Sequence, residues 1–373
     1  MKYISLIILL FLLVFKPAIS NDGAFYARGN QLIPIVETDI SVAKEVLTIK
    51  RISEYLVEIT VLYEFYNPGE AKNVLVGFEA MSPDGDVDGT PKNGQHPYMA
   101  DFTVMLNSKN LPYKVAIVKD SVYYENGHFK SLTEKEAMGK NFDANYPEFY
   151  YVYYFDAHFE KGQNILKHTY RFELSGSVDF DYTLSYVLTA ANRWANNQID
   201  DFILRIDMGD FQDFYIAKNF FEKADDWKMS GEGIISEQND KTPYFLQYFG
   251  TYAHFIVRDG IVVFQKKDFH PEGELSILSA PNIFFGSQFN SEKDELPFSI
   301  KNSEYITKCE NEISKKILRN LPFARRGYVF KNHDIQSYYE KMEWYMPDKN
   351  YSATTNSLTP EEVEWINEID NVE

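Results

Sequence analysis

Cysteine is almost absent from this sequence. One of the 373 residues, Cys309, is a cysteine, so no disulfide can form within the chain. The sequence also lacks an HExxH zinc motif, a GxSxG nucleophile motif and a phosphate-binding glycine loop, and its seven histidines are scattered. The fold must therefore be stabilised by burial of side chains, and no motif indicates a reaction.

Positive charge is also scarce. Lysine and arginine number 37 against 55 aspartates and glutamates, which gives a net charge of -18. Binding to nucleic acid or to anionic lipid depends on clustered cations. The composition therefore argues against general affinity for either, and we expect no nucleic-acid partner.

The chain begins with a short apolar segment. After Lys2, residues 3–15 carry no charge, and residues 17–20 (Pro-Ala-Ile-Ser) place small residues where a signal peptidase cleaves. The run is too short for a membrane-spanning helix, which needs about 20 residues. We predict that residues 1–20 are a signal peptide and that the mature chain, with a net charge of -20 after loss of Lys2 and Lys16, is exported to the periplasm or beyond. A retained N-terminal anchor is the alternative.

Alternating apolar side chains predict strands after the signal peptide. In residues 55–66, valine, isoleucine, tyrosine and phenylalanine alternate with polar residues, as in a sheet with one solvated face. The turn residues 67–70 (Asn-Pro-Gly-Glu) then predict an antiparallel hairpin with a strand over residues 73–79. Asp259-Gly260 predicts a second hairpin, and the 29 Phe and 27 Tyr also favour strands.

The expected fold class is mainly β with a C-terminal α module. We predict an antiparallel β-sandwich over residues 21–287, either whole or as subdomains 21–175 and 176–287. A polar, acidic linker is expected over residues 288–302 and a helical module over residues 303–373.

Apolar residues at the start of the helical module recur at three- and four-residue spacing, which predicts a helix. The first helix is expected to start near residue 303 and to be interrupted at Pro322. A short second helix is expected to restart there, Asn332 is expected to cap a third helix, and residues 359–362 (Thr-Pro-Glu-Glu) form a capping box for a last one. The apolar stripe of the first helix consists of Ile306, Cys309, Ile313, Ile317 and Leu321.

A C-terminal frame resembles the YARHG domain family. It comprises residues 318–328 (Leu-Arg-Asn-Leu-Pro-Phe-Ala-Arg-Arg-Gly-Tyr), Tyr339, Trp344-Tyr345 and Leu358-Thr359. The name-giving motif is residues 323–327, with Phe for the first Tyr and Arg for His. The resemblance covers residues 303–370 and implies a small extracellular helical module without an agreed catalytic role. Gly327 and the two arginines before it also fit a helix end.

A second resemblance concerns the β region. Residues 186–194 (Tyr-Val-Leu-Thr-Ala-Ala-Asn-Arg-Trp), Ile199-Asp200-Asp201-Phe202 and Asn21-Asp22-Gly23 resemble an uncharacterised secreted family, domain of unknown function 4424. The resemblance covers about residues 21–285. It implies an exported β-rich domain and no activity.

The charge of the helical module is divided. Residues 305–341 carry a net charge of +4 and residues 342–373 a net charge of -7. Either the halves neutralise each other, or a cationic face binds an anionic envelope polymer or an acidic envelope protein. The two motif arginines are the first choices, since a guanidinium can bind carboxylate or phosphate with two parallel hydrogen bonds. The candidate binding residues are Lys315, Lys316, Arg319, Arg325 and Arg326.

Three alternating aspartates suggest a calcium loop. Asp84, Asp86 and Asp88 precede Gly89 with the spacing of an EF-hand, but Gln95 stands where that loop has a bidentate glutamate. Calcium binding and an acidic β-turn stay open, and no other cofactor is expected.

No catalytic residue is predicted. His168 alternates with apolar residues and is expected to be a core histidine with satisfied hydrogen bonds. Acidic pairs such as Asp200-Asp201 and Asp225-Asp226 leave a glycosidase possible. We therefore expect a non-catalytic binding or interaction protein of the cell envelope, not membrane-spanning after signal cleavage. An envelope glycan hydrolase with a carboxylate pair and a calcium-stabilised adhesion module are the alternatives.

Overall fold

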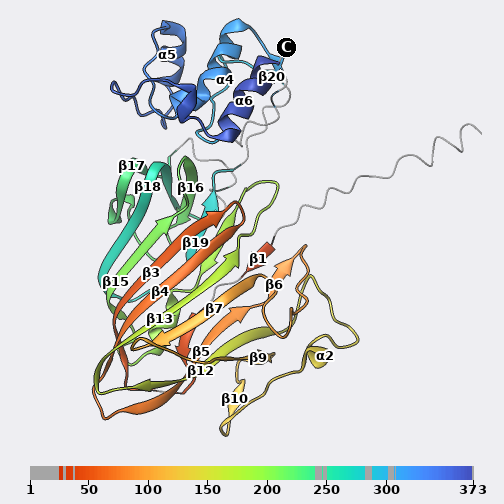
Figure 1. Ribbon diagram of the computed structural model, residues 1–373, viewed down its shortest axis with the longest axis vertical. Coiled ribbons are helices and arrows are strands. Elements are labelled where there is room, and N and C mark those ends of the chain that lie inside the picture. Colours follow the sequence, from red (N-terminus) through yellow and green to blue (C-terminus); the bar gives the residue numbers. More distant parts are fainter. Residues whose placement is uncertain are drawn as a thin grey trace, which may run out of the picture.

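The computed structural model describes residues 25–27, 31–36, 38–239, 246, 250–281, 288–300, 306 and 308–371. The predicted signal peptide and the family-like residues 21–23 lie outside this range. The predicted fold class is confirmed, because the chain is mostly strands with helices near its C-terminus (Figure 1). Within the described residues, no helix is both long and apolar enough to cross a membrane.

Two large sheets form the β region. An 11-stranded sheet has the order β14-β19-β16-β18-β15-β3-β4-β13-β7-β8, with β17 paired to β18, and a four-stranded sheet has the order β2-β5-β12-β9. The strands of the larger sheet are β3 (Ser41–Ser53), β4 (Leu56–Asn67), β7 (Met99–Leu106), β8 (Lys109–Asn110), β13 (Gly162–Glu173), β14 (Thr183–Tyr186), β15 (Ile199–Asp207), β16 (Gln212–Ala217), β17 (Trp227–Glu237), β18 (Tyr252–Phe269) and β19 (Leu275–Ser279). Those of the smaller sheet are β2 (Gln31–Pro34), β5 (Lys72–Met81), β9 (Lys114–Val118) and β12 (Tyr150–Phe159).

The remaining elements are short strands and helices. The short strands are β1 (Phe25–Ala27), β6 (Pro83–Gly85), β10 (Tyr124–Glu125), β11 (His128–Phe129), β20 (Gln288–Phe289) and β21 (Lys308–Cys309). The helices are α2 (Glu134–Ala137), α4 (Glu312–Ala324), α5 (His333–Tyr339) and α6 (Pro360–Asp370), with 3-10 turns η1 (Thr189–Arg193), η2 (Ala224–Asp226) and η4 (Thr355–Ser357).

Aromatic side chains join the two sheets into a sandwich. Phe78 of β5 lies 5.0 Å from Tyr170 of β13 and 5.2 Å from Phe102 of β7, measured between ring centroids. Side chains alternate between buried and partly exposed along β4, as its sequence predicts. The many phenylalanines and tyrosines therefore fill the space between the sheets.

The predicted hairpin between residues 55–66 and 73–79 is wrong. β4 pairs with β3 and β13, whereas β5 pairs with β12 and β2 in the other sheet. The buried side chain of Asn67 donates to the carbonyl oxygen of Glu70 at 3.0 Å and accepts from the N–H of Gly69 at 3.1 Å. The turn is thus formed, but it carries the chain from one sheet to the other.

The predicted hairpin at Asp259-Gly260 is also wrong. β18 continues through these residues, and its partner β17 has a register shift between Glu232 and Gly233. Gly260 has φ +97° and lies opposite Gly231, and a Cβ on Gly260 would lie 2.1 Å from the carbonyl oxygen of Ser230. Glycine therefore permits close approach of two strands here and does not make a turn.

One parallel pairing connects the two halves of the β region. β15 pairs with β3 in parallel, and among the described strands the only other parallel pair is β20 with β21. The larger sheet therefore extends across residues 175–176, where a subdomain boundary was suggested. The division into domains stays a prediction.

The helical caps agree with the sequence. Asn332 accepts from the N–H groups of Asp334 and Ile335, and Thr359 and Glu362 form the predicted capping box of α6. The first helix, however, starts at Glu312, because Asn311 caps it, and Cys309 lies in β21. The expected start near residue 303 is therefore wrong.

Pro322 does not interrupt α4, which continues to Ala324. Proline has no N–H to donate to the carbonyl oxygen of Leu318. The indole N–H of Trp365 in α6 donates to that oxygen instead, at 2.9 Å. The hydroxyl of Tyr339 in α5 likewise donates to the carbonyl of Ile317 at 2.6 Å. Packing of the three helices thus satisfies the disrupted turn.

Residues 288–300, expected to be a linker, pack against the helices. Phe289, Leu296 and Phe298 are buried in the same apolar cluster as α4, α5 and α6. The indole N–H of Trp344 donates to the carbonyl oxygen of Leu296 at 2.7 Å. The helices lie beyond the ends of β16, β17 and β18, at one end of the sandwich (Figure 1).

Candidate functional site: the cleft between the sandwich and the helices

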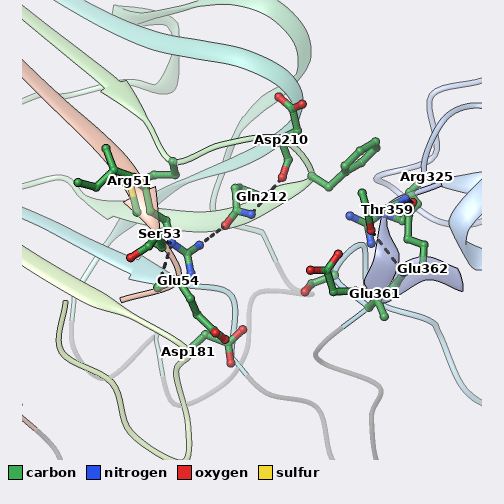
Figure 2. Close-up of a pocket in the computed structure, with 15 residues that line it drawn as sticks. Arg51, Ser53, Glu54, Asp181, Asp210, Gln212, Arg325, Thr359, Glu361 and Glu362 are labelled. Carbon is green, nitrogen blue, oxygen red and sulfur yellow. Dashed lines mark hydrogen bonds and ion pairs between the residues drawn. The ribbon is translucent and has the colours of Figure 1, made fainter. Parts of the chain in front are cut away.

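A cavity of about 450 Å³ separates the sandwich from the helices. One wall consists of the turn between β3 and β4 and the loop before β16. The other contains Arg325, at the end of α4, and the first turn of α6 (Figure 2). The charged and polar lining residues that Figure 2 labels are Arg51, Ser53, Glu54, Asp181, Asp210, Gln212, Arg325, Thr359, Glu361 and Glu362.

Phe211 connects the two walls. Its φ of +55° is unusual for a bulky residue and implies a conformational cost of about 1–3 kcal/mol. The guanidinium carbons of Arg325 and Arg326 each lie 4.4 Å from the centroid of its ring. The backbone N–H of Phe211 donates to the carbonyl oxygen of Arg258 at 3.0 Å. These cation–π contacts hold the helical part on the loop of the sandwich.

Gly327 allows the segment around Met346 to lie close to the contact between the helices and the sandwich. It has φ +84°, and a Cβ there would lie 2.3 Å from the carbonyl oxygen of Met346. That oxygen accepts a hydrogen bond from Nη2 of Arg258 in β18, at 2.5 Å. The glycine of the motif therefore serves both the helix end, as predicted, and contact with the sandwich.

The motif arginines share one buried carboxylate. Glu362 is 1% exposed and accepts a hydrogen bond from Nη1 of Arg326. The Nη1 and Nη2 of Arg326 also donate to the carbonyl oxygens of Pro322, at 3.0 Å, and Ser357, at 3.1 Å. The Nε of Arg325 lies 3.7 Å from Oε1 of Glu362. Two arginines and one glutamate leave this buried group with one net positive charge.

Arg325 is buried but poorly hydrogen-bonded. Its exposure is 8%, and its Nε has no hydrogen-bond partner. Its side chain donates no hydrogen bond to the described residues. Burial lowers the pKa of Arg325 to about 10, with the nearby Glu362 opposing this shift, so the group stays charged at neutral pH. A charged, unsatisfied donor therefore lines the cleft.

Arg51, on the opposite wall, is fully engaged. Its Nη2 donates to the carbonyl oxygen of Glu54 at 2.7 Å, and its Nη1 donates to Oε1 of Gln212 at 2.9 Å. Its guanidinium carbon lies 4.6 Å from the centroid of the Tyr182 ring. Arg51 therefore holds the turn between β3 and β4, unlike Arg325.

The five predicted binding residues do not form one exposed cationic face. Arg325 and Arg326 are buried, whereas Lys315, Lys316 and Arg319 lie on the outer side of α4. The Nε of Arg319 pairs with Asp370 at 2.7 Å, and Nζ of Lys315 donates to the carbonyl oxygen of the same residue. The sequence pattern placed all five on one module, but packing against the sandwich separates them.

The three aspartates of the suggested calcium loop do not converge. Asp84 lies in β6, paired with β1, and Asp86 accepts from Nδ2 of Asn145 at 3.4 Å. Asp88 accepts from the N–H of Thr90 at 3.0 Å, and the hydrogen bonds from Thr90 lower the pKa of Asp88. Among the described residues, no group of three histidine, cysteine, aspartate or glutamate side chains is arranged to hold a metal ion.

Sequence reasoning missed Phe211 and Arg51. Nothing in the residues around Phe211 marks it as a contact for two arginines. His168 was predicted to be satisfied, but both of its ring nitrogens are buried without a hydrogen-bond partner, which corrects that prediction. Its neighbours are aromatic rings, which offer no acceptor in the ring plane.

Comparison with known families identifies the helical part. Residues 298–373 match the model of the YARHG domain, so this part of the chain is a YARHG domain. The resemblance of residues 21–285 to domain of unknown function 4424 stays a prediction. No curated protein matches the chain.

Similarities to solved structures are distant. A candidate nutrient binding protein from Legionella pneumophila is 17% identical, with 94% of this chain and 100% of that chain covered and a TM-score of 0.49. An M1 zinc metallopeptidase from Deinococcus radiodurans is 8% identical, with 68% and 46% covered and a TM-score of 0.25. Baculovirus P35 is 13% identical, with 65% and 98% covered and a TM-score of 0.25. No function is transferred from these proteins.

Proposed function

We propose that this chain is an exported, non-catalytic cell-envelope protein that binds a ligand in the cleft between its sandwich and its YARHG domain. The proposal depends on one observation: Arg325 lines the cleft, is 8% exposed and has a buried Nε without a hydrogen-bond partner. Buried polar groups in proteins are nearly always hydrogen-bonded, and an unsatisfied one costs about 1–3 kcal/mol. A ligand carboxylate or phosphate in the cleft would accept hydrogen bonds from the guanidinium of Arg325.

Two features support export. The N-terminal residues have the charge and apolar pattern of a signal peptide, and the C-terminal part is a YARHG domain, whose family resemblance implies an extracellular module. The ligand is therefore expected among envelope polymers, envelope proteins or small molecules that reach the envelope.

The surroundings of Arg325 suit a binding role. The guanidinium is held by the ring of Phe211 at 4.4 Å and that of Phe298 at 5.5 Å, so its orientation is set before a ligand arrives. Preorganisation of this kind reduces the entropy that binding costs. The volume of about 450 Å³ also lies within the range of about 300–1,000 Å³ that small-molecule sites occupy.

The test is a binding assay with the mature protein, residues 21–373, against fractionated envelope extracts. Arg325→Gln should weaken retention at least about tenfold, because a hydrogen bond to a charged group contributes about 1.5–3 kcal/mol. The substitution removes one charge from a buried group of net charge +1, so the protein should stay folded, which circular dichroism would verify.

Arg319→Gln is the matched control. It removes the same charge from the same helix, but Arg319 is partly exposed, pairs with Asp370 and does not line the cleft. Retention should be unchanged in this variant. Equal losses in both variants would indicate binding on the outer face of α4 and would refute a ligand site in the cleft.

A further inference from the structure

Another cavity, of about 340 Å³, lies on the sandwich and shares no lining residue with the cleft. It is lined by residues of α2, by Lys119 directly after β9 and by residues between 139 and 149, before β12. Figure 1 shows α2 well away from α4, α5 and α6 of the YARHG domain. A ligand of this cavity would therefore be distinct from the ligand proposed for the cleft.

The floor of this cavity is apolar and fixed. The rings of Phe142 and Phe149 stack, with their centroids 6.0 Å apart and their planes inclined by 18°. Phe149 is buried in the core of the sandwich, and Leu132 and Ala137 pack against that core. The floor is therefore continuous with the hydrophobic core, and its shape does not depend on a ligand.

The loop at the rim is anchored to the suggested calcium loop. The N–H of Gly85 donates to the carbonyl oxygen of Asn145 at 2.9 Å, and that of Gly89 donates to the carbonyl oxygen of Ala144 at 2.8 Å. The next residue, Tyr146, lines the cavity and is 63% exposed, the highest value among the large apolar side chains of the described residues. The acidic segment therefore helps to hold an exposed aromatic ring in place, and such preorganisation lowers the cost of binding.

The charges around the cavity are balanced. Two pairs of interactions engage most of them: Lys119 forms an ion pair with Glu148, and Glu136 accepts hydrogen bonds from Thr133 in the capping box of α2. The charged lining residues are Lys119, Lys140, Glu136, Asp143 and Glu148. The two that remain, Lys140 and Asp143, have opposite signs, so the cavity favours an uncharged ligand over an anion or a cation.

The rim offers hydrogen bonds of both kinds. Lys140 donates, the carboxylate of Asp143 accepts, and the amide of Asn141 does both. Within the described part of the chain, the side chains of Lys140, Asn141 and Tyr146 are exposed and form no hydrogen bond or ion pair. A hydroxyl group both donates and accepts, so it can pair with each of these groups. A pyranose ring carries such hydroxyls at its edge and C–H groups on its faces, which suit the ring of Tyr146.

We propose that this cavity binds a neutral saccharide. A sugar ring stacks on Tyr146, and its hydroxyl groups pair with Asn141, Asp143 and Lys140. The volume of about 340 Å³ lies within the range of about 300–1,000 Å³ that small-molecule sites occupy.

The experiment is isothermal titration of the mature protein, residues 21–373, with three uncharged disaccharides: maltose, cellobiose and di-N-acetylchitobiose. At least one should bind with a Kd of about 1 mM or lower. Tyr146→Ala should weaken this binding about tenfold or more, because the stacking surface is lost. Tyr146→Phe keeps the ring and should weaken it less. Asn141→Ala should weaken it about two- to tenfold, through loss of one hydrogen bond.

Tyr66→Ala is the matched control. Tyr66 is 51% exposed on β4 and does not line the cavity, so binding should be unchanged in this variant. Circular dichroism verifies that the variants stay folded, as expected for substitutions of exposed side chains.

Four results would overturn the proposal. If none of the disaccharides binds at about 10 mM, the cavity is not a saccharide site. If Tyr146→Ala binds as tightly as Tyr66→Ala, the sugar binds elsewhere. If Tyr146→Phe loses as much affinity as Tyr146→Ala, the sugar does not stack on the ring. If the uncharged peptide acetylalanylalanine amide binds as tightly as the best disaccharide, the cavity does not select saccharides.

Discussion

His168 and Glu45 of the sandwich are buried in a different way from the arginines of the YARHG domain. In the sandwich, His168 is 0% exposed without a hydrogen-bond partner for either ring nitrogen, and Glu45 is 4% exposed. Burial lowers the pKa of His168 to about 3 and raises the pKa of Glu45 to about 8, so both are neutral at pH 7. In the YARHG domain, Arg325, Arg326 and Glu362 are buried as a charged group.

The difference comes from the backbone. Strands inside a sheet use their N–H and C=O groups in the ladder, so a side chain between two sheets meets few free partners. Helix ends leave unpaired carbonyl and N–H groups. Arg326 donates to the carbonyl oxygens of Pro322, near the end of α4, and Ser357, in η4. A charge can therefore be buried among helix ends, whereas a dry sheet interface forces neutrality.

Removal of the shared carboxylate of Glu362 is expected to have the largest effect on stability. Glu362→Ala should lower the free energy of unfolding by about 3–5 kcal/mol, because it leaves two buried arginines without a counterion. Chemical denaturation at pH 7 measures this. Glu361→Ala, at the exposed neighbouring position, should change it by about 0.5 kcal/mol or less. Similar losses of stability in both variants would show that the interaction of Glu362 with the two arginines contributes little.

Glu45→Gln tests the neutral carboxyl of the sandwich. Its folded pKa of about 8 lies above the unfolded value of 4.5, so its contribution to stability is complete below pH 4.5 and is lost as pH rises to 8. Between pH 4.5 and pH 8, the free energy of unfolding of the natural protein should therefore fall by up to ~1.4 kcal/mol per pH unit relative to that of the variant. Denaturation curves at pH 5 and pH 8 measure the difference. Parallel pH profiles, as expected for the exposed Glu70→Gln, would mean that Glu45 is not buried as a neutral acid.

His168→Phe tests the neutral imidazole. The folded pKa lies below the unfolded value of 6.5, so the contribution of His168 is complete above pH 6.5 and is lost as pH falls toward 3. The variant should lose less stability than the natural protein between pH 6 and pH 4. At pH 7 it should be neutral or about 1 kcal/mol more stable, because two unsatisfied nitrogens are removed.

The exposed His128→Phe is the control for that change and should leave the pH profile unaltered. A large loss of stability in His168→Phe at pH 7 would mean that the imidazole has a partner after all, for example a bound water.

The smallest effect on stability is expected from changes to the two capping boxes. Thr359→Ala should cost about 1 kcal/mol, because α6 buries Trp365, Ile366 and Ile369 and its start must be formed. Thr133→Ala should cost less, since α2 has four residues and none is buried. Thermal or chemical unfolding of both variants provides the comparison. A larger loss at Thr133 would show that the loop around α2 is coupled to the sandwich core.

Local patterns predicted much of the fold. The alternation of β4, the cap at Asn332 and the capping box at Thr359 each depend on a few neighbouring residues, and all three are found. The hairpin predicted after Asn67 failed because its turn is formed correctly but leads into the other sheet. Turn chemistry determines the shape of a turn and does not select the partner of the next strand.

The candidate site was predicted in part. Arg325 and Arg326 were identified through their guanidinium chemistry and the YARHG frame, and Arg325 lines the cleft. Their burial was not predicted, because it depends on Phe211, more than a hundred residues earlier in the chain. The other three candidates lie on the outer side of α4, where no described segment covers them fully. They are Lys315, Lys316 and Arg319, and they are not buried.

By itself, the sequence determined the mainly β composition, the helix caps and the YARHG frame, since each is encoded within a few residues or a recurrent spacing. Tertiary structure alone decided which strands pair, that Trp365 replaces the missing N–H donor at Pro322, and that Arg325 faces a cleft. The reason is physical. Local preferences select backbone conformations, but burial and hydrogen-bond satisfaction are set by segments that are distant in the chain and meet only in the folded protein.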